Sequence, residues 1–455
     1  MKTLLKNQND ALAYFAGNKR PVVFLNQTPI QLMDLRTIIG GLEFICARDC
    51  FDGSHANVFV PQSRLPAGQS LAEQHNGLLR DQDVAQKLRS LGPGVLLTSY
   101  YDEQTHELAS QAGFELCFPS FDMRKQIDNK ISGTSIAAKA GLPCIPYVEG
   151  TVSTYRELLE LTSKLGKDLV IQLPFGGGGA TTFFVSDEDR WNSCRNCVEG
   201  HSAKFMKRIH CEEFAVEACA TKRGTVVGPI FREIIGVPEL TNNPGGWCGN
   251  EVARTLSIEK KIEIFKLTQA FGDEIFGMGY RGAFGLDFLI EKNTENIFFG
   301  ECNPRLTGIT NLTNLATQMS GSVPLILFHL LEWFDVDFQM DLEEVNALNL
   351  NSSVDVSQLI FKYVEEHSLE IVKSPKSGFF RKTDSPELVE SLPNITKLVD
   401  GSGYFLRVAG NGDRVSTGSL LGRLTFTQPI FSRTSQFLDS SHEWVRLVKS
   451  SFGFK

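Results

Sequence analysis

The sequence of 455 residues lacks a hydrophobic run long enough to cross a membrane. One apolar stretch, Val323-Pro-Leu-Ile-Leu-Phe-His-Leu-Leu331, is interrupted by Pro and His and is far shorter than the roughly 20 residues of a membrane span. We therefore expect a buried helix there. The N-terminal stretch Met1-Lys-Thr-Leu-Leu-Lys6 soon becomes polar and lacks the apolar core of a signal peptide. These absences predict a cytoplasmic protein without a membrane partner.

Concentrated basic residues and paired cysteine motifs are also absent. The formal net charge is −8, and nucleic-acid binding needs clustered Lys and Arg, so we expect no nucleic-acid partner. The ten cysteines are scattered, and Cys194-Arg-Asn-Cys197 has no second pair at zinc spacing, which argues against a metal or redox role. With 42% hydrophobic and 22% charged residues, the chain is typical of a globular protein of two or three domains in a reducing compartment.

The usual phosphate-binding fingerprints are missing, but one glycine-rich loop is present. The apolar run Leu169–Pro174 leads to a strand-like run at 180–185 through four consecutive glycines: Gly176, Gly177, Gly178 and Gly179. A strand follows rather than a Lys-Ser/Thr and a helix, which excludes a Walker loop and a dinucleotide fingerprint. Glycine N–H groups can close over phosphate oxygens as an anion nest. A flexible hairpin tip is the alternative, but the entropic cost of four glycines favours phosphate contact.

A second candidate site lies at Glu301-Cys-Asn303-Pro-Arg305, after the strand-like run 296–300. The run Gly282–Ile290 predicts a second buried strand, and a hairpin would place Asp287 beside Glu301 and Asn303. Residues two apart on a strand share a face. Two carboxylates and an amide oxygen suit Mg²⁺ or Mn²⁺, and Arg305 would add a fixed positive charge beside the metal. The alternative is an ordinary turn at Asn303-Pro304.

These pieces, in this order, resemble the ATP-grasp superfamily over roughly residues 123–335. Asp128-Asn129-Lys130 resembles its entry element, and the glycine loop resembles its mobile phosphate flap. Phe205–Ile209, followed by Cys211–Val216, resembles the adenine hinge and the next strand. The resemblance implies ATP as co-substrate, a phosphate contact from Lys130, and metal ligation by Asp287, Glu301 and Asn303. It further implies that the backbone of Arg208 and Ile209 meets adenine, Lys207 flanks it, and Glu213 holds the ribose hydroxyls.

The sequence departs from the superfamily pattern at two positions. The strand before the glycine loop usually carries a phosphate-binding lysine, where this chain has Gln172. Gln forms hydrogen bonds but brings no charge to the phosphates. The hinge usually begins with a glutamate, where this chain has Met206, so packing and backbone would hold the adenine.

The predicted fold combines α/β and α+β parts in three segments. Residues 1–122 alternate short strands with helices, which predicts a small parallel-sheet domain. Residues 123–340 would form the ATP-grasp core of two α+β subdomains, with helices expected at 153–165 and 258–276. Residues 341–455 show short strand-like runs between turns, which resemble a β-rich cap. An oligomer or carrier-protein contact is the alternative for this last segment.

Between these motifs, a strand at 231–236 precedes a Gly/Asn/Pro/Trp-rich loop at 242–250. Loops commonly carry specificity. Arg232 is a candidate catalytic anion contact beside Arg305, and a solvent-facing strand arginine is the equally weighted alternative.

The resemblance implies an ADP-forming carboxylate–amine ligase that acts through an acyl phosphate. Its substrates would be a small carboxylate and an amine, such as amino acids or an acyl group on a carrier protein, and the protein could form a homodimer. Amino-acid ligases resemble it most, with biotin carboxylase and D-alanine:D-alanine ligase more distant. A biotin-carboxylase-like carboxylase is disfavoured because the basic run expected near Arg232 is missing. The other alternative is a nucleotide-binding member without catalysis, which Gln172 and Met206 motivate.

Overall fold

The computed structural model describes residues 4–55, 57–63, 65, 69–381, 398, 401–432 and 434–455, and 387–390 as a strand only. Residues 1–3 of the N-terminal stretch discussed above lie outside this description. The first domain is a five-stranded sheet in the order β4-β3-β2-β5-β6, and all its strand pairs are parallel, as predicted. Its elements are α1 (Gln8–Ala16), β2 (Val22–Asn26), β3 (Leu42–Cys46), β4 (Val58–Phe59), α2 (Leu71–Arg80), α3 (Gln82–Leu91), β5 (Gly94–Leu97), α4 (Glu103–Gln111) and β6 (Phe114–Leu116).

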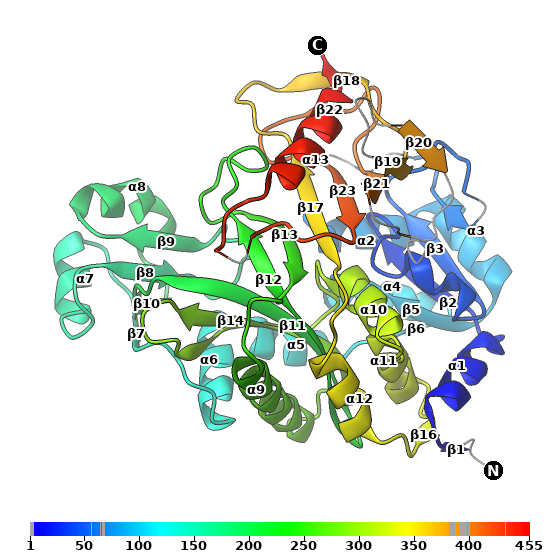
Figure 1. The fold of residues 1–455 in the computed structure, drawn as a ribbon, viewed down its shortest axis with the longest axis horizontal. Coiled ribbons are helices and arrows are strands. Elements are labelled where there is room, and N and C mark those ends of the chain that lie inside the picture. Colours follow the sequence, from blue (N-terminus) through cyan, green and yellow to red (C-terminus); the bar gives the residue numbers. More distant parts are fainter. Residues whose placement is uncertain are drawn as a thin grey trace.

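A small antiparallel sheet, in the order β7-β10-β8-β9, projects from the molecule beside two helices (Figure 1). Strands β8 and β9 pair as a hairpin whose connection is the glycine loop, so the predicted strand–loop–strand arrangement is confirmed. The elements of this part are α5 (Phe121–Asp128), α6 (Lys130–Lys139), β7 (Tyr147–Gly150), α7 (Tyr155–Leu161), β8 (Leu169–Gln172), β9 (Thr182–Val185), α8 (Glu188–Val198) and β10 (Ala203–Lys207).

A ten-stranded sheet forms the centre of the molecule in the order β15-β14-β11-β12-β13-β17-β23-β21-β19-β20. Successive residues of each strand point to opposite faces of this sheet, and apolar side chains cover both faces. Phe284 and Leu286 pack in the same cluster as α9 residues, whereas Ala283 packs in the cluster of α11. The elements of this region are β11 (Cys211–Thr221), β12 (Gly224–Ile235), β13 (Trp247–Val252), α9 (Ile258–Gly277), β14 (Gly282–Glu291), β15 (Ile297–Asn303), α10 (Thr310–Met319), α11 (Leu325–Trp333) and α12 (Leu342–Leu350).

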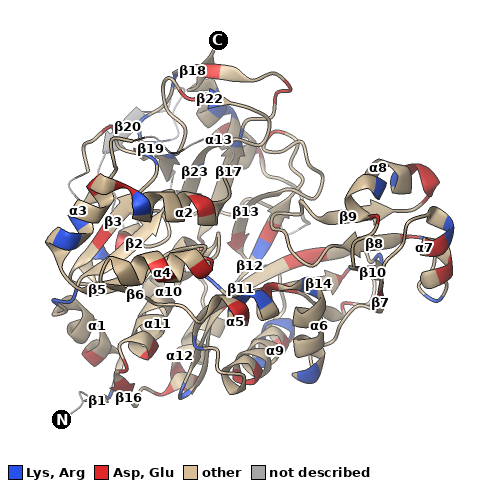
Figure 2. Ribbon diagram, turned by 180° about the vertical axis from the view of Figure 1, so that it is seen from behind, with Lys and Arg blue, Asp and Glu red and all other residues tan. Residues whose placement is uncertain are grey.

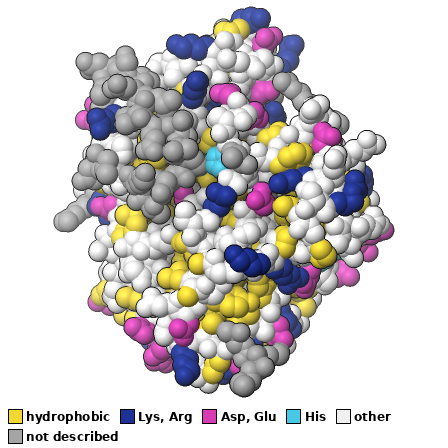
Figure 3. Space-filling model, turned by 90° about the vertical axis from the view of Figure 1, so that its right-hand side faces the viewer, with side chains coloured by type: hydrophobic (Ala, Val, Ile, Leu, Met, Phe, Trp, Pro, Cys, Tyr) yellow, Lys and Arg dark blue, Asp and Glu magenta, His cyan; other side chains and the backbone are white. Residues whose placement is uncertain are grey.

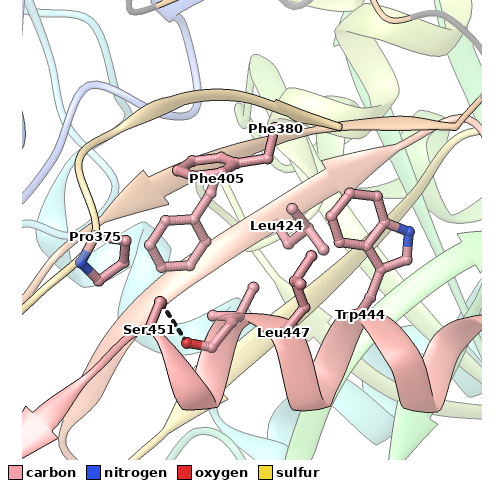
Figure 4. Close-up of a pocket in the computed structure, with 8 residues that line it drawn as sticks. Pro375, Phe380, Phe405, Leu424, Trp444, Leu447 and Ser451 are labelled. Atoms are coloured by element: carbon pink, nitrogen blue, oxygen red, sulfur yellow. Dashed lines mark hydrogen bonds between the residues drawn. The ribbon is translucent and has the colours of Figure 1, made fainter. Parts of the chain in front are cut away.

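The C-terminal segment is rich in strands, as expected, and it extends the central sheet across residue 340. Strand β17 pairs with β13, and β23 pairs with both β17 and β21. Its elements are β17 (Ser357–Lys362), β18 (Leu369–Lys373), β19 (Gly378–Arg381), β20 (Glu387–Glu390), β21 (Ser402–Arg407), β22 (Arg414–Val415), β23 (Leu420–Phe426), α13 (Asp439–Ser450) and β24 (Gly453–Phe454). Helix α13 closes one end of this segment over an apolar pocket between Phe405, Leu424 and Trp444 (Figure 4).

The chain returns to its N-terminal end through a short parallel pair. Strand β1 (Leu4–Leu5) pairs with β16 (Asp337–Phe338), which follows α11. The predicted buried helix is α11, and all its residues from Leu325 to Glu332 are buried. None of the helices in the described ranges is long and apolar enough to span a membrane. On the face shown in Figure 3, acidic and basic side chains are interspersed, and no field of one sign covers it.

Candidate functional site

The predicted metal ligands come together on the hairpin of β14 and β15. Asp287 stands directly opposite Glu301 in the ladder, so both side chains leave the same face of the sheet. Asn303 Nδ2 donates a hydrogen bond to Asp287 Oδ2 at 3.1 Å. Arg305 Nη2 donates to Asn303 Oδ1 at 2.6 Å, which places the guanidinium beside this group as expected.

Further carboxylates from β11 and β12 surround this group. Burial raises the pKa of Asp287 well above its usual range, and the charges of Glu301 and Glu213 add to the effect. Burial and Glu301 together raise the pKa of Glu213 to about 7. Burial also raises the pKa of Glu233, followed by repulsion from Asp287, Glu213 and Glu301. Like charges gathered in this way favour a bound cation.

This donor set fits a hard divalent cation. It offers oxygen atoms only, from a pair of opposed carboxylates and one amide, with two more carboxylates nearby. In the part of the chain that the structure describes, no group of three or more His, Cys, Asp or Glu side chains is closed enough to hold a metal by itself. An open set of this kind suits Mg²⁺, which usually takes further ligands from water and substrate phosphates.

Lys130 links these carboxylates to the glycine loop. Its Nζ lies 3.1 Å from Glu301 Oε2 and also donates to the carbonyl oxygen of Gly176. The lysine is the first residue of α6, and the side chain of Asn129 caps that helix. Lys130 N–H donates to the carbonyl oxygen of Pro174 at 2.9 Å. The predicted phosphate lysine, the phosphate loop and the metal ligands are therefore neighbours.

The glycine loop adopts a conformation that other residues disfavour. Gly178 and Gly179 have φ of 62° and 78°, in the left-handed region. A Cβ at Gly179 would lie 2.7 Å from the carbonyl oxygen of Gly245, whereas Gly177 has open space around it. The loop thus closes against the segment 242–250, which sequence patterns single out as a specificity loop.

Sequence reasoning missed Lys204, which stands opposite Gln172. Strands β8 and β10 pair so that these two residues face each other, and both side chains leave one face of the small sheet. Lys204 is only 2% exposed, and its Nζ donates to Thr134 Oγ1 at 3.0 Å. Burial lowers the pKa of Lys204 to about 8, while Cys144 and Glu301 oppose this effect. Lys204 on the neighbouring strand thus carries the positive charge that Gln172 lacks.

The segment that resembles the adenine hinge follows Lys204 at the end of β10. Met206 is buried, whereas Lys207 is exposed. Arg208 N–H donates to the carbonyl oxygen of Asp168 at 3.0 Å, so the protein itself satisfies this donor. The guanidinium of Arg208 lies over the ring of Phe184, 5.0 Å from its centroid. Ile209 is half-buried between these residues and β11.

Arg232 does not join the group around Arg305. It stands opposite Phe214, whose side chain lies in the cluster of α9, and therefore leaves the other face of the sheet. Its guanidinium is 3.0 Å from Glu212 and 3.8 Å from Glu251, so carboxylates of the protein already pair with it. The site-facing residue of this strand is its neighbour, Glu233. The charged residues of β11 are all acidic, whereas β12 carries charges of both signs (Figure 2).

The N-terminal domain reaches the site through the segment that follows β5. Two guanidinium groups lie over the ring of Tyr100, that of Arg124 at 3.8 Å and that of Arg305 at 5.1 Å from its centroid. Arg124 is buried and forms an ion pair with Asp128 at 3.1 Å. The cation–π contact with Tyr100 thus helps to hold Arg305 beside Asn303.

Comparison with solved structures identifies the architecture. Biotin carboxylase from Campylobacter jejuni superposes with a TM-score of 0.65 at 15% identity, over 95% of this chain and 92% of that one. N5-carboxyaminoimidazole synthase from Aspergillus clavatus, in complex with ADP and 5-aminoimidazole ribonucleotide, gives 0.58 at 13% identity, over 94% and 99%. The chain has the ATP-grasp fold. The biotin carboxylase domain of Hydrogenobacter thermophilus 2-oxoglutarate carboxylase, with MgADP and bicarbonate, gives a TM-score of 0.62 at 12% identity over 95% and 90%.

Sequence comparison finds more limited likeness to curated proteins with this fold. Biotin carboxylase from Haemophilus influenzae is 31% identical over 236 residues, which is 48% of each chain. Pyruvate carboxylase from Staphylococcus aureus is 23% identical over 257 residues, or 54% of this chain and 22% of that one. The matches therefore span about half or less of these curated relatives. No family model matches the chain.

Proposed function

We propose that this protein is an ATP-dependent, ADP-forming ligase that activates a small carboxylate and joins it to an amine. The observation that carries this proposal is the junction at Lys130, whose ammonium touches both Glu301 and the glycine loop. A terminal phosphate at that junction would meet a cation, a backbone nest and the carboxylates Asp287 and Glu301 at once. The solved relatives with this fold are complexes with ATP analogues or ADP, and one contains magnesium.

The chain supplies positioning and charge rather than a covalent nucleophile. Lys130 and Lys204 would bind phosphate oxygens, and the glycine loop would cover them. Asp287, Glu301 and Asn303 would hold Mg²⁺ or Mn²⁺, which neutralises charge on the phosphates when bound. Glu213 and the segment Lys207–Ile209 remain our candidates for the ribose and the adenine. Gln172 would contribute a hydrogen bond beside Lys204.

The reaction would proceed in two displacements. A carboxylate oxygen of the substrate attacks the γ-phosphorus, ADP leaves, and an acyl phosphate remains. The amine nitrogen then attacks the acyl carbon, phosphate leaves, and the nitrogen loses a proton. Arg305, held by Asn303 and Tyr100, would bind the anionic acid and the charge that develops on it. Closure of the glycine loop on segment 242–250 would keep water from the acyl phosphate.

A second candidate function is carboxylation of an amine, with bicarbonate as the acid. The curated and structural relatives include biotin and pyruvate carboxylases, and one of the solved domains holds bicarbonate. The same junction and the same ADP-forming first step serve both reactions. For the ligase function, we propose amino acids or other small acids as substrates. Acyl groups bound to a carrier protein are a further substrate class for the same chemistry. A cytoplasmic location and a homodimer are also proposed, the latter because the Hydrogenobacter domain is a dimer.

One experiment separates these functions from a non-catalytic nucleotide-binding role. ADP release is measured with MgATP, an amine mixture and single acids, including bicarbonate, acetate, succinate and the amino acids. Stimulation by an organic acid supports the ligase, and stimulation by bicarbonate alone supports the carboxylase. If MgATP binds and no acid stimulates ADP release, the protein binds nucleotide without this catalysis. Lys130→Met serves as the inactive control.

A further inference from the structure

Two cations lie together on the central sheet, and no carboxylate among the described residues pairs with them. Arg423 on β23 and Lys362 on β17 are half-buried, and the charge of Arg423 contributes to lowering the pKa of Lys362 after burial does. Burial alone lowers the pKa of Arg423 to about 10. Within the described residues, no Asp or Glu forms an ion pair with either side chain. By contrast, Arg232 and Lys130 each have carboxylate partners.

Backbone carbonyls accept hydrogen bonds from both cations, and Arg423 also lies over an aromatic ring. Arg423 Nη1 donates to the carbonyl oxygen of Gly308 at 3.2 Å, and its guanidinium carbon lies 5.6 Å from the centre of the Trp247 ring. Lys362 Nζ donates to the carbonyl oxygen of Trp247 at 2.7 Å. A carbonyl neutralises only part of a cation, and each side chain keeps further N–H donors. Two adjacent, half-buried cations in this state are costly unless an anion joins them.

A buried network of amide side chains lies beside these two cations. Gln358 Nε2 donates to Gly308 O at 2.9 Å and to Asn250 Oδ1 at 3.1 Å, and both side chains are fully buried. Trp247 Nε1 donates to the same Asn250 oxygen at 3.0 Å. A Cβ at position 308 would lie 2.5 Å from the Trp247 ring, so only glycine allows the ring to lie on the backbone there. The arrangement is rigid and built from four separate segments.

Arg423, Lys362 and the candidate active site lie on the same face of the central sheet. In the central sheet, Glu233 lies opposite Asn250, and Asn250 lies opposite Gln358. Arg423 lies opposite Ile360, which is two residues from Gln358, so the side chains of Arg423 and Gln358 leave the same face. The loop that carries Arg305 also carries Gly308. They are three positions apart in the sequence, so their Cα atoms are at most about 11 Å apart. Glu217 anchors this loop by accepting from Thr307 N at 3.1 Å and from Thr307 Oγ1 at 2.6 Å.

We propose that Arg423 and Lys362, with Trp247 beside them, form a carboxylate-binding subsite for a small substrate that carries a second acid group. The proposal rests on the ligase function above and specifies its substrate class. Arg305 would bind the reacting carboxylate or its acyl phosphate, and the Arg423 subsite would bind the carboxylate that does not react. A dicarboxylic acid of a few carbons fits this arrangement, because one carboxylate can react at Arg305 while the other stays at the Arg423 subsite. A guanidinium and an ammonium match a carboxylate in charge and in hydrogen-bond geometry.

The test compares acids that differ only in the second carboxylate. ADP release is measured with succinate and glutarate, with butyrate and pentanoate as their monoacid counterparts, and with α-amino acids as amine substrates. In the wild type, each diacid should have a KM at least tenfold below that of its monoacid counterpart. Arg423→Gln should remove this preference, raising that KM at least tenfold while kcat falls less than threefold. Arg254→Gln, at an exposed arginine paired with Asp355, is the matched control.

The same variants distinguish a failed subsite from a failed function. Binding of a non-hydrolysable ATP analogue with Mg²⁺, measured by calorimetry, should be unchanged in Arg423→Gln and Lys362→Met. If acids stimulate ADP release but Arg423→Gln affects diacids and monoacids equally, the subsite is wrong and the ligase stands. If no acid or amine stimulates ADP release in the wild type, the ligase itself is wrong. Arg423→Lys keeps a cation and a donor to Gly308, and it should restore part of the preference, which a purely structural role would not require.

Discussion

Replacing Lys204 should stabilise the fold and weaken nucleotide binding at the same time. The ammonium is 2% exposed and its pKa is lowered to about 8, so below that pH the folded protein carries a charge that prefers water. The depression from the ordinary 10.5 to about 8 corresponds to about 3 kcal/mol. The pKa of Lys204 is lower in the folded state than in the unfolded state. The destabilisation of the fold is therefore complete below pH 8 and disappears as the pH rises to 10.5.

Lys204→Met removes the charge and keeps an unbranched chain of similar length. The lost hydrogen bond to Thr134 costs about 1 kcal/mol, but Thr134 Oγ1 still donates to the carbonyl oxygen of Lys130 at 2.7 Å. We therefore expect the free energy of unfolding of the apo protein to rise by about 1–2 kcal/mol at pH 7. A cation 4 Å from a phosphate charge is worth at most about 4 kcal/mol at partial exposure, so affinity for MgATP should fall about 10- to 100-fold.

Chemical denaturation of the apo protein and calorimetry with a non-hydrolysable ATP analogue measure the two effects. Lys139→Met, at an exposed lysine of α6, is the control and should change neither. The double variant Lys204→Gln, Gln172→Lys moves the cation back across the ladder and should recover affinity. A Lys204→Met protein that is less stable and binds the nucleotide as tightly as the wild type would refute the reasoning, because Lys204 would then be structural.

Three further predictions follow from the same geometry. Glu301→Gln should reduce turnover at least tenfold, about 1.4 kcal/mol, with unchanged circular dichroism; a smaller loss would place the cation elsewhere. Gly179→Ala should reduce turnover at least tenfold while Gly177→Ala does not, because only the first clashes with segment 242–250 and has positive φ; equal rates would mean that the loop does not close there. Burial lowers the pKa of His75 to about 4 and that of His329 to about 3, so the unfolded state binds more protons below pH 6.5 and stability should decline as the pH falls from 6.5 towards 4. His75→Gln should flatten this decline in denaturation curves, and an unchanged slope would contradict the assignment.

The parts of the fold that were predictable depend on short-range patterns. The hairpin of β14 and β15 brings Asp287 to Glu301 because one short connection fixes the register, and period-two alternation then fixes the face. The glycine loop was predictable for the same reason, since β8 and β9 are adjacent in sequence. The parallel N-terminal sheet followed from the alternation of strands and helices.

The rest depends on pairings between distant segments. Lys204 reaches Gln172 only through the register of β10 with β8, which the sequence does not specify. On β12 the sequence pattern favours Arg232 as a site residue. Neighbouring strand residues point to opposite faces, however, and the strand pairing puts Glu233 on the site face and Arg232 on the other. Arg423 joins the sheet face from the C-terminal segment, more than 100 residues after Arg305, through β17 and β23. A search for charged residues on strands would have found these side chains, but not their partners.

The central claim is that the junction of Lys130, Glu301 and the glycine loop transfers the terminal phosphate of ATP to a carboxylate. The decisive reaction contains MgATP, an amine and a stimulating acid whose carboxylate is labelled with ¹⁸O; chromatography identifies the nucleotide product, and mass spectrometry reads the label in inorganic phosphate. We expect ADP together with inorganic phosphate that carries one ¹⁸O atom from the acid. AMP and pyrophosphate as the products, or phosphate without the label, would contradict it.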